Sequence, residues 1–180
     1  MDKWNISVLR LNHRINRDKR VTTHLFLTAR AFGVDEAFYS GQKDEKIEEN
    51  IKKVNESWGE SFEPQYTKNY KETIKQWKES GGEIVHLTMY GLPIQDVIHK
   101  IRESPKNKLI VVGGAKVPRA IYELADWNVS VTSQPHSEIS SLSVFLHELY
   151  EGRELFRTFE KAKIKIIPQD KGKKVVRLKL

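Results

Sequence analysis

Serine, histidine and glutamate stand close together in the segment 132–138, which reads TSQPHSE. Such a group could belong to a nucleophilic site, a metal site or a ligand-binding loop. An α/β hydrolase would carry its serine in a G-x-S-x-G turn, and this motif is absent. The run HELYE from His147 lacks the second histidine that H-E-x-x-H zinc sites require. Proline, serine and glutamate in this order are typical of a helix start, so we expect Ser137 and Glu138 to begin a helix.

Two further loops with the residue types of a ligand site are TMYGLP (88–93) and GGAKVP (113–118), each after a short apolar run. In open parallel sheets, ligands bind beyond the carboxyl ends of the strands, which is where such loops would lie. The dinucleotide fingerprint G-x-G-x-x-G and the phosphate loop G-x-x-x-x-G-K-[ST] are both absent. Adjacent glycines at 113 and 114 let a ligand lie against bare backbone. The alternative is that these loops are plain turns.

The spacing of apolar residues predicts the elements that position these loops. Short β-branched runs indicate strands at 4–11, 34–40, 61–67, 83–91, 108–114 and 127–131. Helical spacing indicates helices at 21–32, 43–58, 71–80, 92–104, 117–125 and 137–152. We expect the polar stretch 12–20 to be a loop and 162–180 to form two edge strands or a tail. This alternation favours an α/β fold, a mostly parallel sheet with helices on both faces.

Basic residues gather at the two ends of a chain whose formal net charge is +7. Segment 10–30 holds six basic residues and one acidic residue, and segment 161–180 holds eight and one. Such a distribution suits a surface that binds a polyanion, because neutralised phosphates release counterions. The alternative is that these side chains are simply solvated, as in many heat-adapted proteins.

Composition narrows the class of protein. A chain of 180 residues with 38% hydrophobic residues suits one domain, so we expect a single domain over 1–180 with 161–180 as a basic C-terminal extension. The chain contains no cysteine, which excludes disulfides, thiolate catalysis and cysteine-ligated zinc. No apolar run approaches the roughly 20 residues that cross a bilayer. We therefore expect a soluble, cytoplasmic protein without a metal site.

Several segments together resemble the archaeal tRNA cytidine-56 2′-O-methyltransferases of the SPOUT superfamily. They are HRINRDKRVTTHLFLTARAFG, IVHLTMYG, GGAKVP, YELADWNVSV and QPHSEISSLSVFLHEL, in this order along about residues 10–173. The resemblance implies an α/β sheet whose C-terminal part is tied into a deep trefoil knot. It also implies that S-adenosylmethionine binds in the knot and that the enzyme is a homodimer acting on tRNA.

The same resemblance assigns the cofactor to the three strand-end loops. The family usually has Gly-Ala-Glu where this chain has Gly113, Gly114 and Ala115, and Gly-Asn at 132–133. Backbone contacts rather than the family's side-chain contacts are therefore expected there. The implied cofactor-binding residues are Leu87, Gly113, Gly114, Ala115, Lys116, Val117, Val131, Thr132, Ser133, Gln134, Pro135, His136, Ser137 and Glu138.

Related knotted ribose methyltransferases activate the 2′-hydroxyl with an N-terminal arginine, and here Arg17, Arg20 and Arg30 match that region. We select Arg20 as catalytic, because it ends the polar stretch just before the expected helix; its alternative role is a phosphate clamp. His24 or the phosphate of the RNA is a candidate proton acceptor. The residues expected to bind RNA phosphates are Arg10, Arg14, Arg17 and Lys19.

Three functions stay open at this point. The first is methylation of the 2′-hydroxyl of cytidine 56 in the T-loop of tRNA, or of another RNA nucleotide. The second is a non-catalytic RNA-binding module of the same fold. The third is a small-molecule α/β enzyme with an incidental charge pattern, whose affinity for RNA would not fall steeply with salt.

Overall fold

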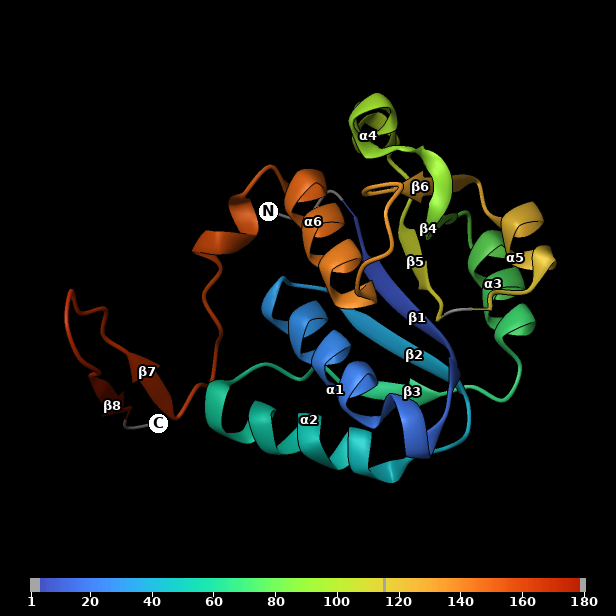
Figure 1. Ribbon diagram of the computed structural model, residues 1–180. Coiled ribbons are helices and arrows are strands. Elements are labelled where there is room, and N and C mark those ends of the chain that lie inside the picture. Colours follow the sequence, from blue (N-terminus) through green and yellow to red (C-terminus); the bar gives the residue numbers. More distant parts are fainter. Residues whose placement is uncertain (1–3, 115, 179–180) are drawn as a thin grey trace.

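The chain folds around a parallel β-sheet (Figure 1). The computed structural model describes residues 4–114 and 116–178, and of Lys19 the backbone alone. In these residues the six-stranded sheet has the order β3-β2-β1-β5-β4-β6, with parallel neighbours. The strands are β1 (Ile6–His13), β2 (Glu36–Gly41), β3 (Pro64–Tyr66), β4 (Glu83–Pro93), β5 (Lys108–Val112) and β6 (Trp127–Ser130). The helices are α1 (Ile15–Ala31), α2 (Glu45–Trp58), α3 (Tyr70–Glu79), α4 (Ile94–Glu103), α5 (Arg119–Leu124), α6 (Glu138–Tyr150) and the 3₁₀ turn η1 (Arg153–Phe156).

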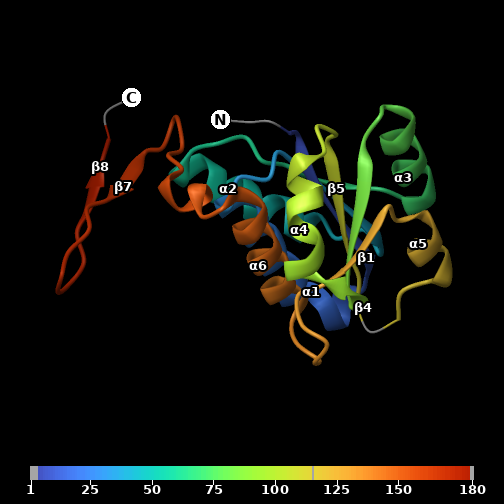
Figure 2. The same cartoon turned by 90° about the horizontal axis from the view of Figure 1, so that it is seen from above.

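Two hydrophobic cores cover the two faces of the sheet. Successive strand side chains point to opposite faces. In β1, Ile6 and Val8 accordingly join the core formed with α1, α2, α4 and α6. Leu9 and Leu11 join the second core, formed with α3 and α5. Figures 1 and 2 show the resulting three layers, with α3 and α5 alone on their side of the sheet. The expected parallel sheet with helices on both faces is confirmed.

Helix α1 begins earlier than expected, and the prediction of a loop at 12–20 is wrong on both sides of Arg14, because β1 continues to His13 and α1 starts at Ile15. The helix starts at Ile15, and its N-cap residue Arg14 makes no capping bond with its own side chain. The buried Asp18 carboxylate instead reaches back and accepts the backbone N–H of Arg14 at 3.1 Å. A carboxylate one turn into a helix satisfies a free N–H and favours the positive helix end. Consequently Arg17 and Arg20 are helical residues, not loop residues.

The carboxyl end of β4 departs from regular pairing. The strand was expected at 83–91 but continues to Pro93, and its register with β6 shifts between Leu87 and Leu92. Gly91 lies against the backbone of Asn128, where a Cβ atom would come within 2.5 Å of the Asn128 carbonyl carbon. Only glycine fits so close an approach. Within this irregular segment, Thr88, Met89 and Tyr90 line a cavity.

The basic C-terminal segment forms its own hairpin. Strands β7 (Ile164–Ile166) and β8 (Val175–Arg177) pair antiparallel in a separate two-stranded sheet. The sequence indicated either two edge strands or a tail. The structure shows two strands, but they do not extend the edge of the main sheet. Figure 2 shows the hairpin projecting away from the layers. Among the described residues, no helix is long and apolar enough to cross a membrane.

Candidate functional site

The irregular end of β4 and the loops that follow β5 and β6 converge at one edge of the sheet and line a cavity of about 460 Å³. We call it the loop cavity. Its volume lies in the range of small-molecule and cofactor sites, roughly 300–1,000 Å³. The lining residues are Arg17, Leu87, Thr88, Met89, Tyr90, Val112, Gly113, Gly114, Val117, Tyr122, Gln134, Pro135, His136, Glu138 and Ser141.

A closely packed glycine and two hydrogen bonds lie at or beside this cavity. A Cβ atom on Gly113 would come within 2.2 Å of Val117 Cγ2, so the loop closes only around a glycine. On the opposite wall, the hydroxyls of Thr88 and Tyr122 lie 3.2 Å apart within hydrogen-bond distance. Ser137 Oγ accepts the backbone N–H of Ile139 at 3.2 Å, which confirms the expected helix start. The loop before α6 is thereby held against the cavity.

A second cavity of about 490 Å³ adjoins the first. It is lined by four arginine and lysine side chains, whereas the loop cavity is lined by Arg17 alone among the arginines and lysines of the described chain. We call this second cavity the basic cavity. Arg17 and Gly114 line both cavities. Its lining residues are Arg10, Asn12, His13, Arg14, Arg17, Asp18, Gly41, Gln42, Gly114 and Lys116.

Arg10 is buried between helix α6 and the sheet. It has the strand parity of Ile6 and Val8, so its side chain faces α1 and α6. Only 2% of the side chain is exposed, and its Nη2 atom lies 3.4 Å from Glu138 Oε1. Burial lowers the pKa of the guanidinium, while Glu138 opposes that shift. A guanidinium still stays charged at neutral pH, so the site holds a permanent buried cation.

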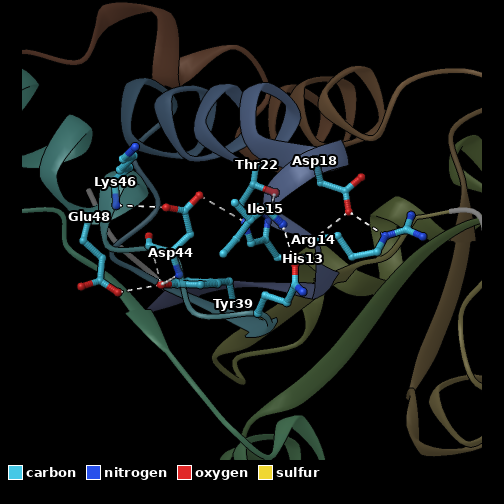
Figure 3. Close-up of polar contacts among 10 residues, drawn as sticks. His13, Arg14, Ile15, Asp18, Thr22, Tyr39, Asp44, Lys46 and Glu48 are labelled. Atoms are coloured by element: carbon cyan, nitrogen blue, oxygen red, sulfur yellow. Dashed lines mark hydrogen bonds and ion pairs between the residues drawn. The ribbon is translucent and has the colours of Figure 1, made fainter.

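A buried polar network surrounds His13, which is one of the residues that line the basic cavity (Figure 3). His13 Nδ1 lies 2.9 Å from Thr22 Oγ1 on α1, and its Nε2 lies 3.5 Å from Asp44 Oδ2. Asp44 also caps α2 through the N–H of Lys46. Burial lowers the pKa of His13, partly offset by Asp44. With both ring nitrogens turned to protein groups, His13 fixes α1 and α2 relative to β1 and does not face a substrate.

The cofactor residues expected from the sequence divide into those that line the loop cavity and those that do not. Val131 packs against the larger core, Ser137 caps α6, and the Thr132 hydroxyl accepts the N–H of Gln134. Lys116 lines the basic cavity instead, and Ala115 lies outside the described residues. Thr132, Ser133, Val131 and Ser137 are not among the lining residues. The expected residues that do line the loop cavity are Leu87, Gly113, Gly114, Val117, Gln134, Pro135, His136 and Glu138.

The expected basic residues also separate. Arg10, Arg14 and Arg17 line the basic cavity, whereas the side chain of Lys19 lies outside the described residues. Arg20 is exposed on α1 and is not among the residues that line either cavity.

Arg30 lies at the far end of α1, where its guanidinium binds Asn55 Oδ1 and the Gly59 carbonyl. It also stacks over the ring of Phe159, 5.0 Å from its centroid. Arg17 is therefore the only one of the three candidate arginines that lines these two described cavities.

Apart from Arg17, six residues that line the loop cavity were not among the expected cofactor-binding residues. Thr88, Met89, Tyr90 and Val112 lie in or directly beside the segments 88–93 and 113–118 that the sequence indicated as ligand loops, whereas Tyr122 and Ser141 do not. Tyr122 projects from α5, and Ser141 from the second turn of α6. Ser141 follows Glu138 by three residues, so helical spacing places both on one face and could have identified it. Tyr122 had no comparable signal. Among residues 4–114 and 116–178, no group of three or more histidine, aspartate or glutamate side chains is placed to hold a metal ion.

Known proteins resemble the chain along nearly its whole length. A methyltransferase named tRNA (cytidine(56)-2′-O)-methyltransferase from Methanothermobacter thermautotrophicus is 54% identical over 168 residues, covering 93% of this chain and 94% of its own. One of the same name from Methanocaldococcus jannaschii is 50% identical, covering 97% of each chain.

Solved structures share the fold at low sequence identity. The TrmH/SpoU tRNA modifying enzyme of A. aeolicus matches with a TM-score of 0.63 and 18% identity, covering 84% of this chain and 77% of its own. The SpoU methyltransferase AviRb of Streptomyces viridochromogenes, solved in complex with AdoMet, matches with a TM-score of 0.60 and 12% identity, covering 85% and 59%. Residues 58–176 match the family described as tRNA ribose 2′-O-methyltransferase, aTrm56. The chain belongs to this tRNA ribose 2′-O-methyltransferase family.

Proposed function

We propose that this enzyme transfers a methyl group from S-adenosylmethionine to the 2′-hydroxyl of cytidine 56 in tRNA. Its near-full-length similarity to methyltransferases named for that reaction supports the assignment. The observation that carries it structurally is the junction of two cavities. A cofactor-sized cavity and a basic cavity meet at Arg17 and Gly114, so a small cofactor and an RNA phosphate would lie side by side.

The residues of the loop cavity fit S-adenosylmethionine. Leu87, Met89 and Val112 offer apolar surface, and Gly113 presents backbone without a side chain. Glu138 supplies the negative charge that suits a cationic cofactor. When bound, the cofactor supplies an activated methyl group on a positively charged sulfur.

The chain's own task is to orient and activate the ribose hydroxyl. A 2′-hydroxyl is a weak nucleophile at neutral pH, so a nearby cation must stabilise the negative charge that develops on it. An arginine serves in this way and not as a base, because its pKa exceeds about 12. We assign that task to Arg17, which lines both cavities, in preference to Arg20, the residue that the sequence favours. His24 is exposed on α1 and, like Arg20, is not among the residues that line either cavity, so of the two candidate proton acceptors we prefer the RNA phosphate.

We also propose how the enzyme binds RNA, how its C-terminal part folds and in which oligomeric state it acts. Arg10, Arg14 and Arg17, which line the basic cavity, would bind RNA phosphates together with Lys19. The C-terminal part of the α/β domain would be tied into a trefoil knot, and the enzyme would act in the cytoplasm as a homodimer. Exposed apolar side chains at Tyr90 and Leu92, beside the loop cavity, are compatible with a subunit contact. Sedimentation equilibrium tests the dimer, and a monomer at micromolar concentration would contradict it.

Calorimetric titration separates a methyltransferase from a non-catalytic RNA-binding module of the same fold. The enzyme should bind S-adenosylmethionine with one site per chain. A protein that gives no heat of binding with this cofactor, but still binds tRNA, would be the module instead. Gly113→Ala provides the matched variant, because its methyl group would collide with Val117 and should weaken cofactor binding.

A further inference from the structure

A buried cation stands between the two cavities with part of its hydrogen-bonding capacity unused. Among the described residues, the Nε and Nη1 atoms of Arg10 have no hydrogen-bond partner, although both are buried. The remaining nitrogen, Nη2, lies 3.4 Å from Glu138 Oε1, which is longer than a strong charge-assisted bond of about 2.7–2.9 Å. A buried charge with a single loose partner is costly to keep. Arg10 is therefore suited to accept a further anion.

Gly114 forms the wall at this point. A Cβ atom on Gly114 would lie 3.6 Å from both Arg10 Nη2 and Glu138 Oε1, and 3.7 Å from Arg10 Nη1. The residue lines both cavities, and it places no side chain between the ion pair and either cavity. Both charged side chains are thus reachable at the junction.

The two partners of the ion pair face different cavities. Arg10 lines the basic cavity, and Glu138, with 28% of its side chain exposed, lines the loop cavity. A cation in the loop cavity would compete with Arg10 for the Glu138 carboxylate. An anion in the basic cavity would compete with Glu138 for the Arg10 guanidinium. Each ligand would therefore take one partner and release the other for the second ligand.

We propose that the Arg10–Glu138 pair couples the two cavities by charge, so that a cationic cofactor and an RNA phosphate bind cooperatively. This inference depends on the proposed function, which supplies the cation and the anion. Coupling between two sites is reciprocal, so a phosphate must raise cofactor affinity by the factor by which the cofactor raises phosphate affinity. Two nearby groups also act on Arg10: Asp18 favours its charge and Arg14 opposes it, and neither lines the loop cavity.

The same coupling would loosen the product. In the reaction the methyl carbon–sulfur bond breaks with its electron pair left on sulfur, and a carbon–oxygen bond forms to the ribose. The hydroxyl proton leaves to the acceptor or to water. The sulfur compound that is left, S-adenosylhomocysteine, has no sulfonium charge. Glu138 would then return to Arg10, and the hold of Arg10 on the phosphate would weaken when methylation is complete.

The test compares the charged cofactor with its neutral product in the full chain. Each is titrated calorimetrically with and without inorganic phosphate at constant ionic strength. Phosphate should tighten S-adenosylmethionine binding by about fivefold or more, a typical allosteric coupling, and leave S-adenosylhomocysteine binding unchanged. An equal effect on both ligands, or no effect on either, would overturn the inference. An absence of S-adenosylmethionine binding would refute the proposed function and the coupling with it.

A matched pair of variants on α6 locates the effect. Glu138→Gln keeps the side-chain shape but removes its charge, and should abolish the difference between the two ligands. Glu148→Gln removes a carboxylate from the same helix that lies 4.0 Å from Arg102, and should keep the difference. If Glu138→Gln retained the full phosphate effect, the pair would not be the coupling element. The comparison of the two ligands in the unsubstituted chain needs no variant to fold.

Discussion

Replacing Arg17 with alanine should slow methyl transfer far more than replacing Arg20, although the two arginines lie one helical turn apart on α1. Arg17 lines both cavities, and Arg20 lines neither. Removing one preorganised donor to a developing oxyanion costs about 2.7–4 kcal/mol, or about 10²–10³ in rate. Because 62% of the Arg17 side chain is exposed, solvent screens its charge. We therefore expect the lower end of this range, a decrease in rate of about hundredfold.

The assay is single-turnover methylation of a tRNA transcript with excess enzyme and saturating labelled S-adenosylmethionine. Arg17→Ala should lower the maximal rate about hundredfold, with cofactor affinity by calorimetry staying near that of the unsubstituted chain. Arg20→Ala is the charge-matched control and should mainly raise the tRNA concentration needed. The reasoning is refuted if Arg17→Ala keeps a near-normal rate while Arg20→Ala collapses, which would support the assignment made from the sequence.

Three further predictions concern a buried histidine and a buried ion pair of the sheet, and a glycine that lines the loop cavity. Burial lowers the pKa of His86 in the folded protein below its usual value near 6.5. As pH falls, the unfolded chain therefore binds the proton first, and the free energy of unfolding decreases below about pH 6.5. In urea unfolding at several pH values, the free energy of unfolding of His86→Gln should fall less steeply with decreasing pH than that of the unsubstituted chain, by at most about 1.4 kcal/mol per pH unit. An unchanged slope would contradict this. The fully buried Lys108 places its Nζ atom 3.0 Å from Glu83 Oε1. Lys108→Met should lower the free energy of unfolding by about 3–5 kcal/mol, because it leaves the Glu83 carboxylate buried without this partner. Adding Glu83→Gln to Lys108→Met should restore part of the lost unfolding free energy, measured by denaturant unfolding. If the effects of the two substitutions were simply additive, the two side chains would not stabilise each other. Gly113→Ala, whose Cβ would meet Val117, should weaken S-adenosylmethionine binding without lowering the melting temperature of the ligand-free protein by more than a few degrees, and unaltered affinity would show that this loop does not contact the cofactor.

Local patterns in the sequence were sufficient for the layers of the fold. Short apolar runs in β1 and β5 and helical spacing in α2 and α4 arise from the same burial that the structure shows, so these elements were predictable. The start of α1 was not, because its N-cap is Arg14 and the stabilising carboxylate, Asp18, acts backwards from inside the helix. No standard start signal precedes Ile15.

The site was predictable as a set of loops but not as a set of contacts. Parallel-sheet topology places the loops after β4, β5 and β6 at one edge, whatever their sequence. The ion pair of Arg10 with Glu138 joins residues 128 positions apart, and no local pattern announces it. The projection of Tyr122 into the loop cavity depends on how α5 packs and is likewise a tertiary property.

Nucleoside mass spectrometry of tRNA tests the central claim most directly. A transcript with cytidine at position 56 is incubated with the enzyme and S-adenosylmethionine, beside a transcript with uridine at that position. We predict 2′-O-methylcytidine in stoichiometric amount in the first transcript and none in the second. No 2′-O-methylcytidine at any enzyme concentration would contradict the account, and equal amounts in both transcripts would show that another nucleotide is the target.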